Sequence, residues 1–371
     1  MTHNLRLTMA KFLGLLWCAC IATFAQAQNV TTPRASQAAE VSQTIGLTKV
    51  TINYSRPSVR GRKIWGNLVP YGFQKINFAS RGEIPWRAGA NENTVFTNSH
   101  ELKINGKTLP AGSYGFHLAL QENGNVTVIF SKNNQAWGSY FYKESEDVLR
   151  AEGKLTDSPL QVEQLMYLFE DVKSNSATIS LYWGKKKISF PITVDVKNIT
   201  LASIKKQMTN VQAFNWQGAY SAARYATSNN LDMDQALAWI NQSISQQSNF
   251  QNNSLKAFIL MRTNKKDEAS KMIDQVLPLG NVNQLHGFGR QLIRAKMPQK
   301  ALEVFEYNYK KHKNTWPVNV GLMRGYSANG DFKKALKHAK AALKNVPKGD
   351  TRNGPSLQAA IKKLEKKEDI N

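Results

Sequence analysis

Seven residues between positions 56 and 92 combine cationic, amide, acidic and aromatic side chains, the types that bind polar ligands. They are Arg56, Arg60, Arg62, Trp86, Arg87, Asn91 and Glu92. Guanidinium groups grip carboxylates and phosphates through paired hydrogen bonds, and an indole ring offers a stacking face. The cluster therefore predicts a pocket for an anionic or sugar-like ligand. The alternative is structural: Arg87 pairs with Glu92, and the tryptophans fill the edge of the fold.

Catalytic residues cannot be assigned from the sequence, and whether the chain is an enzyme stays open. It has no Gly-x-Ser-x-Gly elbow for a nucleophilic serine and no phosphate-binding P-loop. A glycosidase needs two facing carboxylates. The alternative function is a carbohydrate-active or other hydrolase. In that case Glu92 and a second carboxylate would converge in a cleft beside the arginines and Trp86.

No cofactor and no metal site is expected. Asn91, Glu92 and Asn93 precede His100 and His117, but this spacing matches no set of three or four converging metal ligands. His117 alternates with apolar neighbours along an expected strand, so it is predicted to be exposed or at a sheet edge.

Period-two alternation predicts β-strands from about residue 40 to residue 197. The alternating sets include Tyr114, Phe116, Leu118 and Leu120, then Val126, Val128 and Phe130, then Ile179, Leu181 and Trp183, then Ile188, Phe190, Ile192 and Val194. Asn105-Gly106 indicates a hairpin turn, and Glu122–Asn125 and Trp183-Gly184-Lys185 indicate further turns. Strands without intervening helices favour an all-β, sandwich-like antiparallel domain. The candidate residues lie in its irregular segment, residues 54–97.

Small residues repeat at a helical period in the second half of the chain. Ala236, Ala269, Ala301 and Ala335 are spaced by 33, 32 and 34 residues, and each is followed four residues later by Ile240, Ile273, Phe305 or Ala339. This period is typical of tetratricopeptide repeats, in which the alanine lets two helices pack closely. We expect a connecting helix over 198–214, three to four helix pairs over 215–350, and a capping helix and tail over 351–371. The fold class is therefore α+β multidomain: an all-β domain followed by an all-α solenoid.

The first 27 residues have the pattern of a secretory signal peptide. Arg6 and Lys11 precede an apolar run from Phe12 to Phe24, which Ala25-Gln26-Ala27 follows. We therefore expect an exported protein, in the periplasm or outside the cell or associated with the outer membrane, with no transmembrane segment after cleavage. Residues 28–39 are predicted to be a flexible leader. The only cysteines, Cys18 and Cys20, lie in the signal segment, so no disulfide is expected.

The formal net charge of +23 favours anionic neighbours. Nucleic acid is not expected as a partner, because the lysines scatter over helix faces without interleaved aromatic residues. An anionic glycan bound by the β-domain without chemistry is a further hypothesis.

The segments Tyr54–Gly66, Trp86–Thr94 and Leu109–Tyr114 resemble an uncharacterised family of exported bacterial proteins, domain of unknown function 2911. The resemblance covers about residues 35–196, and it implies that tetratricopeptide-like repeats often follow the domain. It implies no activity for any residue. The main functional hypothesis is a non-enzymatic binding or scaffold protein. A helical-repeat groove would bind protein partners, and the β-domain pocket a small or anionic ligand.

Overall fold

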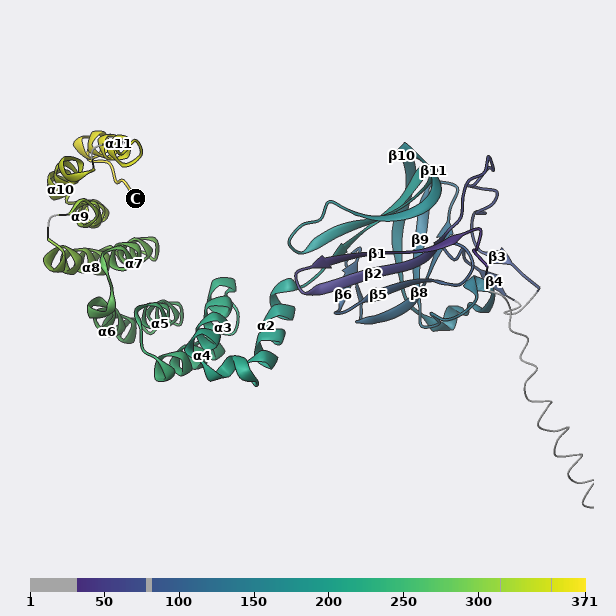
Figure 1. Cartoon of the computed structure of the whole chain (residues 1–371), viewed down its shortest axis with the longest axis horizontal. Coiled ribbons are helices and arrows are strands. Elements are labelled where there is room, and N and C mark those ends of the chain that lie inside the picture. The colour runs from purple at the N-terminus through teal and green to yellow at the C-terminus, as the bar shows by residue number, and fades with distance from the viewer. Residues whose placement is uncertain (1–31, 78–81, 314, 348) are drawn as a thin grey trace, which may run out of the picture. The chain divides into compact units, whose positions relative to one another are not determined.

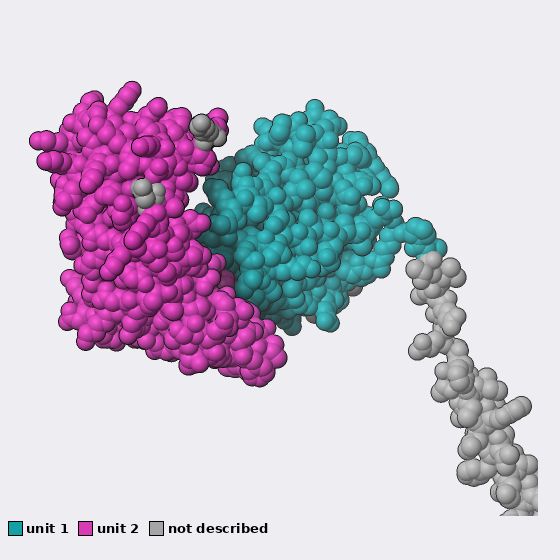
Figure 2. Space-filling view, turned by 60° about the vertical axis from the view of Figure 1, so that its left-hand side comes forward, with its two compact units in different colours: residues 1–196 teal, residues 197–371 magenta. Residues whose placement is uncertain are grey.

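The structure is a computed structural model that describes residues 32–77, 82–313, 315–347 and 349–371. The predicted signal peptide, residues 1–27, lies outside the described residues. The chain divides into two compact units, and the boundary along the sequence falls between Val196 and Lys197 (Figure 2). Strands form the first unit and helices the second (Figure 1), which confirms the predicted fold class.

Nine described strands form one antiparallel sheet in the order β1-β2-β5-β8-β9-β10-β11-β6-β7. The strands are β1 (Gln37–Ile45), β2 (Thr48–Arg56), β5 (Thr94–Asn98), β6 (Leu102–Ile104), β7 (Lys107–Leu109), β8 (Gly112–Leu120), β9 (Asn125–Ser131), β10 (Asp147–Glu170) and β11 (Ser176–Thr193). A separate ribbon consists of β3 (Gln74–Lys75) and β4 (Glu83–Ile84). Two short 3-10 helices, η1 (Gly138–Phe141) and η2 (Glu144–Glu146), join β9 to β10. Asn105 and Gly106 both have positive φ, as the predicted hairpin turn requires.

The sheet curls back on itself around an apolar core. Ser58, just after β2, forms an antiparallel bridge with Gln164 of β10, although the two strands are four places apart in the sheet. Phe116 lies inside the curl, where its fully buried ring contacts four other rings. Those rings belong to Phe96, Phe130, Tyr167 and Phe190, at centroid distances of 5.4–6.2 Å.

The structure of the β-domain differs from the sequence expectations at two places. The predicted turn at Trp183-Gly184-Lys185 is wrong, because β11 runs without interruption through these residues. Gly184 has a φ of 62°, and it lies where the pairing with β10 shifts register around Val162. Positive φ serves a β-bulge as well as a turn, so the glycine bends a continuous strand here. In addition, β1 begins at Gln37, inside the range 28–39 that was expected to be a leader.

The second unit is a succession of antiparallel helices. They are α2 (Val196–Gln207), α3 (Trp216–Asn229), α4 (Met233–Gln246), α5 (Phe250–Arg262), α6 (Lys266–Val276), α7 (Val282–Arg294), α8 (Pro298–Lys311), α9 (Trp316–Ala328), α10 (Phe332–Asn345) and α11 (Asn353–Glu365), with short 3-10 turns η3 (Val211–Phe214) and η4 (Leu277–Leu279). Polar loop residues cap several helices, and Asn249 and Asn281 each form a full capping box. None of the described helices is long and apolar enough to cross a membrane.

The repeated alanines lie where the period predicts. Ala236, Ala269, Ala301 and Ala335 are all fully buried, and each is on the second helix of a pair: α4, α6, α8 or α10. The residues four positions later are at most 1% exposed. Within the described residues, α3 to α10 therefore form four helix pairs that stack into a curved solenoid.

Candidate functional site

Three of the seven predicted site residues meet at one cavity of the β-domain. Arg60, Arg62 and Trp86 line a space of about 310 Å³ together with Trp183 of β11 and the backbone around Gly89. The cavity lies between the irregular segment that follows β2 and the middle of β11. Part of the predicted cluster thus converges on open space.

The aromatic wall of this cavity is fixed by packing. The rings of Trp86 and Trp183 stack at 6.0 Å and 12°, and Trp65 meets both edge-on. The backbone of Trp86 exchanges two 2.8 Å hydrogen bonds with Leu118 of β8. Trp183 is 2% exposed, and its buried Nε1 has no hydrogen-bond partner among the described residues. An unpaired buried donor costs stability, and because this nitrogen is buried, an occupant of the cavity does not reach it.

The two arginines of the cavity differ in how they are held. The guanidinium of Arg62 donates to the carbonyls of Val59 and Ser58, at 3.1 and 2.6 Å. Arg60 has a φ of 48°, and its backbone N–H donates to Glu163 Oε1 at 2.9 Å. The exposed guanidinium of Arg60 makes no ion pair within the described parts of the chain. Arg60 is therefore the cation that remains available to a ligand.

Arg56, Arg87 and Asn91 serve the scaffold instead. Arg56 Nε donates to the carbonyl of Leu165 at 2.9 Å. The Arg87 guanidinium donates to the carbonyl of Asn91 and lies 4.9 Å from the centre of the Tyr140 ring. Asn91 Nδ2 in turn donates to the carbonyl of Ser36 at 3.0 Å. These contacts hold the irregular segment against its neighbours.

Glu92 lies apart from the cavity and is paired with another arginine. Its Oε1 accepts a hydrogen bond from Arg34 at 2.5 Å, so the expected alternative of an Arg87–Glu92 pair is wrong. The Arg34 hydrogen bond is the main cause that lowers the pKa of Glu92. Glu92 and Glu40 line a shallow depression of about 370 Å³. A glycosidase needs one carboxyl group that keeps its proton as the general acid. The lowered pKa of Glu92 favours its ionised form instead.

His117 is buried, which contradicts the prediction of an exposed or edge position. It is 2% exposed, and its Nδ1 lies 2.9 Å from Oγ of Ser139 in η1. Burial, and secondarily the positive charge of Arg87, lowers the pKa of His117 to about 3. The sequence missed this because both faces of β8 are covered, the outer one by η1. Ser139 is 1% exposed, so a substrate cannot reach this serine–histidine pair in the structure.

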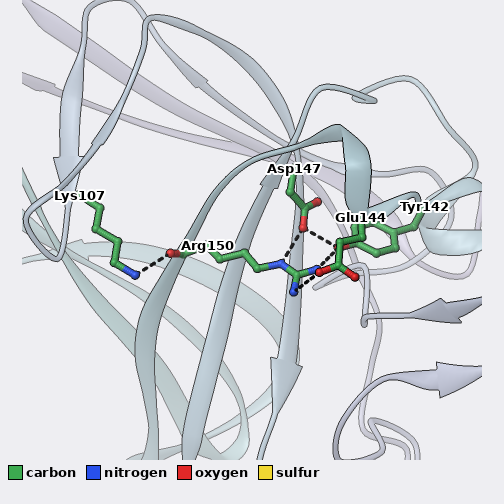
Figure 3. A network of polar contacts seen from close by, with 5 residues as sticks. All are labelled: Lys107, Tyr142, Glu144, Asp147 and Arg150. Carbon is green, nitrogen blue, oxygen red and sulfur yellow. Dashed lines mark hydrogen bonds and ion pairs between the residues drawn. The ribbon is translucent and has the colours of Figure 1, made fainter.

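A polar network fastens η2 to the start of β10 (Figure 3). Arg150 Nε and the Tyr142 hydroxyl both donate to Asp147 Oδ2 at 2.7 Å, and the Arg150 guanidinium also donates to the Tyr142 oxygen at 2.8 Å. Glu144 pairs with the same guanidinium at 3.0 Å from the solvent side. Desolvation is the main cause that raises the pKa of Tyr142 and of Asp147. Asp147 Oδ2 accepts both donors, whereas its buried Oδ1 has no hydrogen-bond partner among the described residues. The contacts to Oδ2 tie η2 to β10.

A groove of about 950 Å³ lies in the helical unit, where it is formed by the first helices of three successive pairs. Its lining from α3, α5 and α7 includes three arginines and no aspartate or glutamate. The arginines are Arg224, Arg262 and Arg294, one on each helix, and the apolar part is formed mainly by Phe250, Leu255, Phe258, Met261 and Phe288. We call this surface the inner groove.

The inner groove carries more free charge than the β-domain cavity. Arg224 and Arg294 are exposed and form no ion pair in the described ranges, whereas Arg262 donates to the carbonyl of Thr227. Sequence reasoning did not name these residues. One available signal was their spacing of 38 and 32 residues, close to the repeat period.

Two family models match the chain. Residues 36–192 match the family described as "Protein of unknown function (DUF2911)", and residues 225–351 match "Psidin, N-terminal TPR repeats region". The resemblance inferred from the Arg- and Trp-containing segments is thereby confirmed, and the first match contains all seven predicted site residues. The two matches together support a protein-binding scaffold. No curated protein matches the chain.

Solved structures of tetratricopeptide repeat proteins are similar to part of the chain. YrrB, described as a TPR protein with an unusual peptide-binding site, is 17% identical over 44% of this chain and 86% of its own, with a TM-score of 0.28. The C-terminal part of a TPR repeat-containing protein from Cytophaga hutchinsonii is 13% identical over 46% and 67%, with a TM-score of 0.34. A tetratricopeptide repeat protein from Parabacteroides merdae is 12% identical over 47% and 75%, with a TM-score of 0.32.

Proposed function

We propose that this chain, a domain of unknown function 2911 followed by tetratricopeptide-like repeats, is an exported, non-enzymatic scaffold whose inner groove binds an acidic, extended segment of a protein partner. Export rests on the signal-peptide pattern of residues 1–27. The binding role rests on the groove.

The observation that carries the proposal is the composition of the inner groove. Three arginines line it without a single acidic residue, so an acidic segment gains Coulomb attraction with no repulsion from the wall. The half-buried Phe250 and Phe258 between them offer apolar contact area, which supplies most of the affinity in such grooves. The preferred segment thus combines carboxylates with an aromatic or aliphatic anchor.

Peptide binding to the purified full chain tests this proposal. Three fluorescent peptides share one apolar anchor and carry four glutamates, four glutamines or four lysines, and anisotropy measures their affinity. We expect the order glutamate, glutamine, lysine. Arg224→Gln should weaken binding of the glutamate peptide about fivefold, because an exposed ion pair contributes up to about 1 kcal/mol. Arg352→Gln removes the same charge outside the groove and is the control. Equal affinities for all three peptides would contradict the proposal.

A second binding site, for a small anionic ligand in the β-domain cavity, is favoured by the uncommitted guanidinium of Arg60 and by Trp86 in the cavity lining. A carboxylate accepts paired hydrogen bonds from a guanidinium group. Thermal-shift screening with sugar acids and small carboxylates tests it. A hit should lose its stabilising effect in Arg60→Gln and keep it in Arg56→Gln, whose guanidinium lies outside the cavity lining. A hit unaffected by Arg60→Gln would rule out this cavity as its site.

A further inference from the structure

The segment after α11 turns back onto α9. Lys367 has a φ of 57°, which reverses the chain directly after the helix. Ser327 Oγ of α9 donates to Asp369 Oδ1 at 2.7 Å, and the same oxygen accepts the N–H of Ile370 at 3.2 Å. Asn371 Nδ2 donates to the carbonyl of Arg324 at 3.1 Å. We call residues 366–371 the return segment.

The return segment contacts Arg324 of α9, whose guanidinium donates to Asn371 Oδ1 at 3.4 Å. Burial, and then the positive charges of Arg290 and Arg294 of α7, lower the pKa of Arg324 of α9. Asp369 acts in the opposite direction on Arg324. It is an acidic group that the chain itself places near this cationic cluster of Arg290, Arg294 and Arg324. Arg294 also lines the inner groove, so the cluster continues that groove toward α9.

The return segment binds with two kinds of contact. The Asp369 carboxylate accepts a hydrogen bond from Ser327 and adds negative charge near Arg324. The half-buried Ile370 packs against the apolar cluster shared by α9, α10 and α11. An acidic residue followed by an aliphatic one is the composition that the proposed function assigns to the partner. In Figure 1 the end labelled C lies on the inner side of the curve formed by the helices.

We propose that the α7–α9 face is a docking site for an acidic–aliphatic segment of the partner, and that the return segment occupies it until the partner displaces it. The inference rests on the proposed function and adds its regulation. A tethered segment competes at a millimolar effective concentration, so it lowers the apparent affinity for any partner that needs this face.

Two matched substitutions in the full chain test the competition. Asp369→Asn weakens the return segment's hold on Ser327 and the arginines. Glu368→Gln removes the same charge one residue earlier, where the side chain is exposed and makes no ion pair in the described chain. The probe is a labelled peptide with the sequence Glu-Asp-Glu-Asp-Ile-Asn. We expect Asp369→Asn to tighten its binding about tenfold, and Glu368→Gln to leave it within twofold of the unsubstituted chain.

Hydrogen exchange at the Ile370 amide provides the second measurement. The bond to Ser327 protects this amide, and saturating peptide should accelerate its exchange in the unsubstituted chain. Equal peptide affinities for Asp369→Asn and Glu368→Gln, or an Ile370 amide that stays protected at saturation, would overturn the competition. If Arg224→Gln still weakens binding in that case, the proposed function survives. Absence of binding by the Asp369→Asn chain would overturn both.

Discussion

The ring of Phe305 on α8 lies so close to Gly289 on α7 that a Cβ built on the glycine would stand 2.5 Å from Phe305 Cε1. Gly321 and Gly325 of α9 approach the same ring, with built Cβ atoms 2.7 and 2.9 Å from it. The helix pair α7–α8 therefore docks onto α9 through one large side chain placed among three glycines.

Gly289→Ala should destabilise the helical unit even though alanine is the better helix former. The helix gains about 1 kcal/mol from the substitution, whereas overpacking a close-packed core costs about 1–3 kcal/mol. Because the clash involves a fully buried ring, the cost should lie toward the upper end of that range, and we expect a net loss of up to about 2 kcal/mol in the free energy of unfolding.

Gly287 is the control on the same helix. Its built Cβ meets nothing within 4 Å, so Gly287→Ala should stabilise the unit by up to about 1 kcal/mol. Urea unfolding followed by far-ultraviolet circular dichroism measures both variants. Stabilisation by both would mean that Phe305 moves aside freely, which would contradict the packing described here.

His117 should make the β-domain lose stability as the pH falls below 6.5. The folded pKa is lowered to about 3 by burial first and Arg87 second, whereas the unfolded side chain takes up a proton near 6.5. The unfolded state therefore binds more protons throughout this window, and stability falls by up to about 1.4 kcal/mol per pH unit. The contribution is fully present above pH 6.5.

Urea unfolding at pH 7, 6 and 5 checks this, because carboxylates change little over that range. His117→Gln should flatten the pH dependence of the β-domain transition. His286→Gln should not, because His286, whose pKa is lowered to about 4, belongs to the helical unit. A steep slope that survives in His117→Gln would show that another group titrates.

The helical repeat was predictable because its signal is local and recurs. An alanine and a larger residue one turn later must both be buried wherever two helices cross closely, so each unit repeats the same constraint. The structure buries Ala301 and Phe305 completely, as expected. In the β-domain, by contrast, Gly184 carried a local signal of positive φ that fits a turn and a bulge equally.

The site was only partly predictable, because convergence depends on long-range packing. Arg60 and Trp86 meet only where β11 brings Trp183 beside them, more than 90 residues further along the chain. The burial of His117 depends on η1, which covers the outer face of its strand. The arginines of the inner groove are exposed, so the pattern of buried residues that predicts the helix pairs does not place them.

Substitution of Arg150 should lower the free energy of unfolding more than substitution of its exposed partner Glu144. Arg150→Met leaves the Asp147 carboxylate, whose side chain is 9% exposed, without its charged donor. Hydrogen bonds to charged groups contribute about 1.5–3 kcal/mol, and partial exposure of the arginine reduces this, so we expect a loss of about 1–2 kcal/mol. Glu144→Gln should cost less than about 1 kcal/mol because that ion pair is solvated. Thermal unfolding of both variants measures the difference, and equal losses would contradict a role for the network in holding β10.

Salt separates the two contributions to binding in the inner groove. Its arginines are exposed, so their attraction for a carboxylate acts through solvent and is screened over about 10 Å at 0.1 M salt and about 3 Å at 1 M. The apolar contacts with Phe250 and Phe258 are not screened, and salt does not weaken them. The glutamate peptide should therefore lose affinity between 0.1 and 1 M sodium chloride, while the glutamine peptide keeps or gains affinity.

The double substitution Arg224→Gln, Arg294→Gln should make the affinities of the glutamate and glutamine peptides change with salt in the same way. A glutamate peptide that binds more tightly at 1 M salt would show that the groove selects its segment by apolar contact alone, against the electrostatic selection proposed for it.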